Sequence, residues 1–341
     1  RNQSSAASDV YKRQKKGCLI IEPSPKLLKE YQKNVQNNFE EIQLNLSKLA
    51  KPSFNSKGDR ILVKINADSM DLLTKIDPEH CDGIGLTRTE FLIKDGHIPS
   101  EEEQFQVYSN LVKWSCGKPI TIRTFDVGGD KPVEGITNNE ENSFLGFRGI
   151  RVSLKFKDLF RSQIRALLRA TALGPIQVML PMVTIPEEVE ETREIITEEY
   201  LNLCEKGMKA GIPKLGIMVE VPLAALSIEK FDVDFYSIGS NDLIQYLSAT
   251  ARDNRSVSYL YHAKYSAFWD LMSKINAHGH RTGREVSICG DIASDTNYLE
   301  KLLDNGFRSI SVSPNSLVNV KTYLASKILK EEPNKEVFKL N

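Results

Sequence analysis

The sequence predicts an α/β protein, and three observations lead to this fold class. Eight short apolar runs alternate with helical patterns along about 270 residues. Several runs carry no charge, which suits strands buried on both faces of a parallel sheet. Polar side chains follow the points where the runs end. Eight strand–helix units predict a (β/α)8 barrel of the TIM type preceded by a long linker helix, with a doubly wound open sheet as the alternative.

The composition is that of a globular protein without a charge excess. Of 341 residues, 40% are hydrophobic and 26% charged, and the formal net charge is zero. Nothing in this balance predicts binding to nucleic acid or to an anionic membrane. No apolar run approaches the roughly 18 residues of a membrane-spanning helix. The five cysteines are scattered without a CxxC pair, which argues against a disulfide framework or a zinc site and favours a cytoplasmic location.

The first 57 residues are predicted to precede the barrel. Residues 1–17 lack the pattern of a signal or transit peptide, and we expect a disordered or non-native lead-in to a fragment. Residues 18–57 would hold the end of an upstream domain and the linker helix. Ser24 before Pro25 is typical of a helix start, and apolar residues then recur every three or four positions until Pro52. A coiled-coil partner helix is the alternative interpretation.

Residues 58–331 are predicted to form the barrel, and 332–341 a C-terminal tail. The expected strands are 61–66, 83–87, 119–124, 176–181, 215–220, 235–239, 286–289 and 310–313, with amphipathic helices such as 187–206 and 297–303 between them. The interval 126–175 is too long for a simple crossover. Insertions of this kind are usually functional.

If the barrel closes, the residues that follow its strands share one mouth. In 233–252 an apolar strand stops at Gly239, and Asn241 and Asp242 then open a helix. Other strands are followed by Arg88, Arg123, Glu220 and Cys289, while Arg148 and Arg252 lie in adjoining connections. Simpler roles exist for each type: helix caps for the polar pair, structural ion pairs for the charged groups and a buried apolar residue for the cysteine.

The residue types at these strand ends predict an anion site with a metal. Glu220 and Asp242 would suit Mg²⁺, with Mn²⁺ as the alternative, because such ions take carboxylate, water and substrate oxygens. Guanidinium groups beside them suit a phosphate, which they bind in a bidentate fork. We therefore expect a small phosphorylated or carboxylated anion bound with a divalent cation.

Six motifs occur in order at the predicted strand ends. They are GIGLTRTEFL (83–92), TIRTFDVGGDK (121–131), FLGFRGIR (144–151), MVEVPLAA (218–225), SIGSNDLIQY (237–246) and SICGDIAS (287–294). Over about residues 18–330 the sequence resembles the phosphoenolpyruvate (PEP)-binding part of phosphoenolpyruvate–protein phosphotransferases, enzyme I of the bacterial sugar phosphotransferase system. Similar motifs occur in pyruvate phosphate dikinase and PEP synthase.

The resemblance implies a role for each residue of the mouth. Glu220 and Asp242 would bind magnesium, and Asn241 and Asp242 would bind PEP. Arg88, Arg123 and Arg252 would clamp the phosphate, and Arg148 would be a further contact near the phosphoryl group. Cys289 would protonate the enolate carbon to give pyruvate. Thr87, Ser143 and Ala251 depart from the usual motifs, and Ala251 stands where an aspartate usually precedes the arginine at position 252.

The resemblance also implies partners. Members of this family pass the phosphoryl group to a histidine on an upstream domain. That histidine stands in a Gly-rich stretch followed by Ser-His. The five histidines of this chain (His80, His97, His262, His278 and His280) have no such setting, so we expect no self-phosphorylation. A homodimer is implied, and the histidine-containing phosphocarrier protein would bind only through an N-terminal region missing here. The alternatives are the barrel of a dikinase or PEP synthase, a lyase or aldolase on a related barrel, and a non-catalytic PEP-sensing dimer module.

Overall fold

The structure is a computed structural model that describes residues 10–13, 18–21, 24, 49–94, 96–128, 143–252 and 254–330. The chain divides into two compact units, residues 1–48 and 49–341. In the first unit, β1 (Val10–Arg13) and β2 (Cys18–Ile21) pair antiparallel. β1 lies within residues 1–17, for which we expected a disordered or non-native lead-in. The predicted linker helix falls on residues outside the described ranges.

The second unit is built on a closed parallel barrel, as predicted. Its strands are β4 (Arg60–Ala67), β5 (Ile84–Arg88), β6 (Ile120–Arg123), β7 (Ile176–Leu180), β8 (Lys214–Val219), β9 (Phe235–Gly239), β10 (Glu285–Cys289) and β11 (Ser309–Val312). Each strand pairs with the next in sequence, and β11 pairs with β4 in parallel from Ser309↔Leu62 to Val312↔Ile65, which closes the ring. All eight expected strands are thus observed, with ends that differ by at most one residue.

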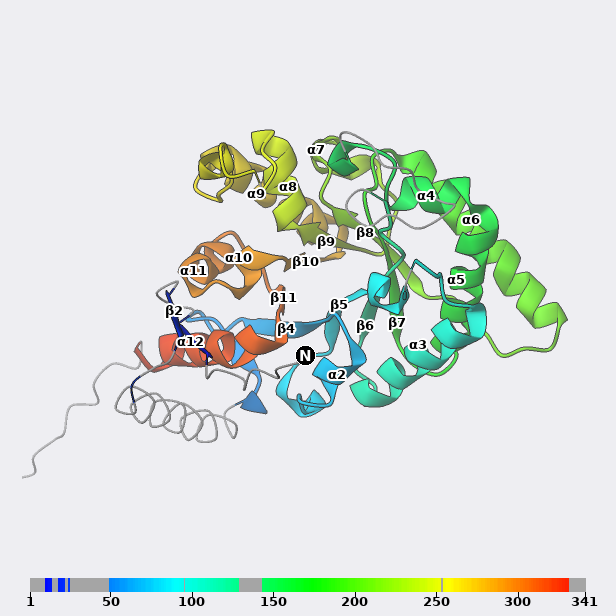
Figure 1. Ribbon diagram of the computed structural model, residues 1–341, viewed down its shortest axis with the longest axis horizontal. Coiled ribbons are helices and arrows are strands. Elements are labelled where there is room, and N and C mark those ends of the chain that lie inside the picture. Colours follow the sequence, from blue (N-terminus) through cyan, green and yellow to red (C-terminus); the bar gives the residue numbers. More distant parts are fainter. Residues whose placement is uncertain are drawn as a thin grey trace, which may run out of the picture. The chain divides into compact units, whose positions relative to one another are not determined.

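Helices lie outside the ring of strands (Figure 1). The α-helices are α2 (Met70–Leu73), α3 (Glu101–Ser115), α4 (Ile150–Lys155), α5 (Lys157–Thr171), α6 (Pro186–Glu205), α7 (Pro222–Leu226), α8 (Ser240–Ser248), α9 (Ser266–Thr282), α10 (Asp291–Ser294), α11 (Thr296–Asp304) and α12 (Leu317–Lys330). Local sequence sets several of their ends. Ser100 and Glu103, for example, form a capping box at the start of α3. In the described part of the chain, no helix is both long and apolar enough to span a bilayer.

The stretch 52–58, whose Pro, Ser, Asn and Gly residues are typical of a linker, contains a strand. β3 (Ser53–Phe54) pairs antiparallel with the start of β4. The turn between them forms because the Asn55 side-chain oxygen accepts hydrogen bonds from the backbone N–H groups of Lys57 and Asp59. Turn residues that look like a linker in sequence therefore make a hairpin.

The long interval 126–175 carries η4 (Ser143–Leu145), α4 and α5. Three of its residues, Asp126, Phe144 and Arg148, line a cavity at the carboxyl ends of the strands. An apolar cluster of Leu86, Met179, Met218, Phe235 and Cys289 packs together, and three of its members line the same cavity. Apolar packing inside the barrel therefore supports the cavity, while the insertion adds to its wall.

Thr87 should be a source of instability, and its replacement tests this. Its hydroxyl is fully buried and has no hydrogen-bond partner, whereas the buried hydroxyl of Thr121 donates to Gln177 Oε1 at 3.1 Å. We expect Thr87→Val to raise the free energy of unfolding by about 1 kcal/mol and Thr121→Val to lower it by a similar amount. Urea denaturation measures both, and shifts of the same sign would contradict the assignment.

Candidate active site

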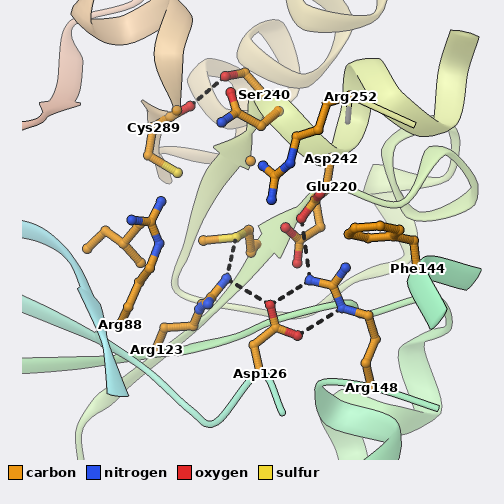
Figure 2. A pocket seen from close by; sticks show the side chains of 15 residues that line it. Arg88, Arg123, Asp126, Phe144, Arg148, Glu220, Ser240, Asp242, Arg252 and Cys289 are labelled. Atoms are coloured by element: carbon orange, nitrogen blue, oxygen red, sulfur yellow. Dashed lines mark hydrogen bonds and ion pairs between the residues drawn. The ribbon is translucent and has the colours of Figure 1, made fainter. Parts of the chain in front are cut away.

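The carboxyl ends of the strands surround a cavity of about 300 Å³. All eight residues predicted for the site line it: Arg88, Arg123, Arg148, Glu220, Asn241, Asp242, Arg252 and Cys289. They come from four strand ends and from the connections after β6 and β9. Figure 2 shows all of these side chains except that of Asn241 labelled around one space. The closed barrel therefore brings together residues up to 201 positions apart, as the strand-end argument predicted.

Glu220 follows β8 and is 1% exposed. Its Oε1 accepts a hydrogen bond of 2.7 Å from the backbone N–H of Met182. Burial, then the negative charges of Asp242 and Asp126, raise the pKa of Glu220 to about 8, against the opposing effect of two nearby arginines. Among the described residues, no cation lies within ion-pair distance of Glu220, so the simple salt bridge considered for it is absent.

Asp242 lies in the first turn of α8, beside Glu220. Its Oδ2 is 3.5 Å from Nη2 of Arg148, and its Oδ1 is buried without a hydrogen-bond partner. A buried carboxylate oxygen with no donor is costly unless a ligand or ion satisfies it. Gly239, at the end of β9, lets the side chain of Glu220 lie close to that strand, because a Cβ at position 239 would lie 2.8 Å from Oε2 of Glu220.

These two carboxylates fit a divalent cation that also binds a substrate. The part of the chain that the structure describes contains no cluster of three or more His, Cys, Asp or Glu side chains suited to a metal. Mg²⁺ needs no such cluster, because it is commonly held by one or two carboxylates together with water and substrate phosphates. The unpartnered Oδ1 of Asp242 and the mutual repulsion of the two carboxylates are both features that a cation would relieve.

Two of the predicted arginines are already paired with buried carboxylates. Arg148 forms a fork with Asp126, with Nε–Oδ1 and Nη2–Oδ2 distances of 3.1 and 2.7 Å. Arg123 lies 3.0 Å from Glu90 and 3.2 Å from Asp126. Burial opposes both positive charges, but the neighbouring carboxylates outweigh it and raise the pKa of each arginine. Both guanidinium groups therefore stay charged and fixed in place.

The other two arginines are less constrained. Arg88 pairs with Asp68 at 2.8 Å, and both side chains are more than a third exposed, so this pair contributes little stability. Arg252 has no carboxylate within ion-pair distance in the described ranges, and its backbone N–H donates to Gln245 Oε1 at 3.3 Å. Ala251 offers no carboxylate either, so these two guanidinium groups remain available to an anion.

Cys289 ends β10 and is 3% exposed. Its thiol donates to the carbonyl of Ile238 at 3.4 Å and accepts from the hydroxyl of Ser237 at 3.9 Å. Burial raises the pKa of Cys289 to about 11, although the charge of Arg88 opposes this. A thiol with this pKa keeps its proton at neutral pH, so it is suited to donating one and not to acting as a thiolate nucleophile.

The side chain of Asn241 is fixed by the start of the connection that follows β10. Its Oδ1 accepts a hydrogen bond of 3.0 Å from the backbone N–H of Asp291. Gly290 has φ 98° and allows this contact, since a Cβ there would lie 2.7 Å from the same oxygen. Among the described residues, the amide nitrogen of Asn241 has no hydrogen-bond acceptor, and Asn241 lines the cavity.

Sequence reasoning missed three groups that shape this site. Glu90 and Asp126 fix the inner arginines, and Asp126 stands in the TFDVGGDK stretch three positions after Arg123, a spacing that could have indicated an ion pair. Met182 has φ 58°, a rare left-handed conformation for a residue with a side chain. That conformation directs its N–H to Glu220, and nothing in the local sequence signals it.

Comparison with known proteins places these residues in a family. The sequence profile of the family described as "PEP-utilising enzyme, PEP-binding domain" matches residues 44–328. Phosphoenolpyruvate-protein phosphotransferase of Geobacillus stearothermophilus is 38% identical over 323 residues, which cover 93% of this chain and 55% of that protein. The protein of the same name from Bacillus subtilis is 35% identical over 322 residues, covering 93% of this chain and 56% of that protein. The chain thus spans about half the length of these curated relatives.

A solved structure is similar in fold. The HpcH/HpaI aldolase/citrate lyase family protein from Burkholderia cenocepacia superposes with a TM-score of 0.50, covering 81% of this chain and 96% of that chain. The two sequences are 12% identical. At this identity the likeness concerns the barrel alone and says nothing about the reaction.

The raised pKa of Glu220 should make the stability of the metal-free protein fall with pH. The unfolded chain releases this proton near the ordinary value of 4.5 and the folded chain near 8, so the folded state holds the extra proton in that window and stability decreases as pH rises through it. Glu220→Gln lacks this loss. In EDTA, we expect its gain in unfolding free energy over the unsubstituted chain to be larger at pH 8 than at pH 5.

Glu199 provides the control for this pH experiment. Burial would raise its pKa, but hydrogen bonds from Arg161 and Arg165 outweigh burial and lower it. Glu199→Gln should therefore be less stable than the unsubstituted chain at both pH values. A gain for Glu220→Gln that is the same at pH 5 and pH 8 would show that burial does not raise the pKa of Glu220.

Proposed function

The chain belongs to the family of PEP-utilising enzymes, and on this premise we propose that its barrel binds PEP with Mg²⁺ and supports transfer of the phosphoryl group to a histidine outside this chain. Pyruvate is the other product. The relatives named phosphoenolpyruvate-protein phosphotransferase support this assignment. This chain supplies the residues that bind PEP and release pyruvate.

One observation carries the proposal: four guanidinium groups, two carboxylates that ion pairs do not fully neutralise, and a protonated thiol converge on one small cavity. PEP carries a carboxylate and a phosphate on three carbon atoms, so it is a small and highly charged anion. The arginines supply its counter-charges, and the cavity of about 300 Å³ lies at the lower end of the usual range for ligand sites.

In the proposed reaction the arginines position and neutralise the substrate. Arg88, Arg123 and Arg252 bind phosphate and carboxylate oxygens, Arg148 lies near the phosphoryl group, and Asn241 donates its amide to PEP. Phosphoryl transfer depends mainly on such positioning and charge stabilisation. Mg²⁺ or Mn²⁺, held by Glu220 and Asp242, would supply further positive charge for the phosphate and enolate oxygens.

The thiol of Cys289 completes the reaction. When the bond between phosphorus and the bridging oxygen breaks, its electron pair remains on the enolate of pyruvate. The carbon terminus of this enolate takes the proton of Cys289, and the thiolate left behind regains a proton from solvent. The pKa of about 11 keeps the thiol protonated until it is needed.

The acceptor and the partners belong to the proposal as well. None of the five histidines in this chain stands in a Gly-rich stretch followed by Ser-His, so we propose that the acceptor, and through it the phosphocarrier protein, is reached through sequence that the longer relatives contain. We also propose a cytoplasmic location, in keeping with the free cysteines 81, 116, 204 and 289.

We further propose that two copies of the chain form a dimer. The proposal rests on the family, and exposed leucines support it: Leu145, Leu223 and Leu226 are more than half exposed, and Leu145 lines an open groove of about 610 Å³ next to the active cavity. Sedimentation equilibrium of the chain tests this proposal, and a monomer at all concentrations would contradict it.

Binding of PEP should require a divalent cation. We expect isothermal titration calorimetry to detect binding with Mg²⁺ or Mn²⁺ and to show at least a tenfold loss in EDTA, because the arginines alone leave the repulsion of Glu220 and Asp242 in place. Asp242→Asn should reproduce the loss in the presence of metal. Asp304→Asn, on the exposed end of α11, is the matched control. Equal binding by both variants would contradict the assigned metal ligands.

Cys289→Ala distinguishes a catalyst from a non-catalytic PEP sensor. For this assay, the chain is fused to the upstream region of a relative, which supplies the acceptor histidine. We expect the variant to bind PEP but to form pyruvate at least about a hundredfold more slowly, because general acid catalysis commonly contributes that much. Cys116→Ala, which replaces an exposed thiol, should not change the rate. An unchanged rate for Cys289→Ala would favour the sensor.

A further inference from the structure

Arg148 is held from two sides. Asp126 binds it on one side through the fork described above. On the other side lie two residues of α8, namely Asp242, with Oδ2 3.5 Å from Nη2, and Tyr246, whose hydroxyl lies 3.5 Å from Nη1. Asp242 and Tyr246 are four positions apart, so they share one face of the helix. One helix face thus meets both terminal nitrogens of the guanidinium group.

The Tyr246 hydroxyl makes a second contact with the same connection. It donates a hydrogen bond of 2.5 Å to the backbone carbonyl of Phe144. A phenolic hydroxyl has one proton to donate and lone pairs to accept, so it can bind the Phe144 carbonyl and the Arg148 N–H together. Burial raises the pKa of Tyr246 to about 12, so this proton is present throughout the physiological pH range.

Both partners of Tyr246 line the active cavity, but Tyr246 does not. Phe144 and Arg148 are part of the cavity wall, and Figure 2 shows them facing the same space as Asp242. Tyr246 instead lines the neighbouring groove. Its hydroxyl therefore acts on the site through its contacts with Phe144 and Arg148, and it also lies 3.8 Å from Sδ of Met182. The connection 143–148 has little regular structure between η4 and α4.

We propose that Tyr246 is a positioning residue whose hydroxyl ties the connection carrying Phe144 and Arg148 to the helix carrying Asp242. The consequence is that one rigid element, α8, sets both the carboxylate proposed for the metal and the arginine proposed for the phosphoryl group. This inference rests on the proposed function, because it assigns a role in binding the phosphoryl end of PEP. If Tyr246 served folding alone, its replacement would weaken the binding of different ligands to the same extent.

The test compares two ligands on the Tyr246→Phe variant of the chain. PEP carries the phosphoryl group, whereas oxalate resembles only the carboxylate and enolate oxygens. With Mn²⁺ present, we expect calorimetry to show PEP binding weakened about three- to tenfold, the loss of one hydrogen bond, and oxalate binding unchanged. Tyr259→Phe, at a position 71% exposed, is the control and should bind both ligands like the unsubstituted chain.

Unchanged PEP binding by Tyr246→Phe would overturn the inference, as would an equal loss for PEP and oxalate. If the unfolding midpoint of the variant falls, a double-mutant cycle with Arg148→Lys in urea denaturation decides. Non-additive effects would support the contact, and additive effects would overturn it. An unsubstituted chain that binds neither ligand would contradict the proposed function itself, so the two failures are distinguishable.

Discussion

The site depends on an imbalance of buried charge at the mouth of the barrel. Four carboxylates (Glu90, Asp126, Glu220 and Asp242) lie around two inner guanidinium groups, those of Arg123 and Arg148. Asp126 and Glu90 pair with these arginines, so Asp242 keeps only a 3.5 Å contact with Arg148, and Glu220 has no ion-pair partner among the described residues. Burial makes this arrangement unfavourable in isolation. The cation and the anionic substrate that we propose would relieve the repulsion between Glu220 and Asp242.

The barrel supplies the rigidity that this arrangement needs. Arg123 and Glu220 stand at the ends of parallel strands and Asp242 in the first turn of α8, so their backbones are fixed by the sheet. Close contacts are possible because Gly239 and Gly290 have no side chains where Glu220 and Asn241 approach. Met182 accepts a left-handed backbone conformation, and its N–H thereby orients Glu220. Backbone conformations of this kind cost about 1–3 kcal/mol, which is consistent with a geometry kept for function and not for stability.

Much of this could be predicted from sequence, for identifiable physical reasons. The eight strands are largely apolar runs, and a parallel barrel places every strand end at one mouth, so the six site residues at strand ends followed from topology. Arg148 and Arg252 lie in adjoining connections. The carboxylates that pair with the inner arginines could not be predicted in this way. Arg123 and Glu90 are 33 positions apart, and no local pattern couples them. The conformation of Met182 has no signature, and β3 was hidden because its turn residues resemble a linker. The sequence therefore indicated which side chains meet, but not how each one is held.

The central claim is that Glu220 and Asp242 hold a divalent cation in direct contact with the phosphate of PEP. The most direct test uses Mn²⁺, whose unpaired electrons speed the relaxation of nearby nuclei, and records the phosphorus NMR relaxation of PEP bound to the chain. The account predicts strong, saturable enhancement that is lost in the Glu220→Gln variant. Enhancement that is absent, or equally strong in that variant, would contradict it.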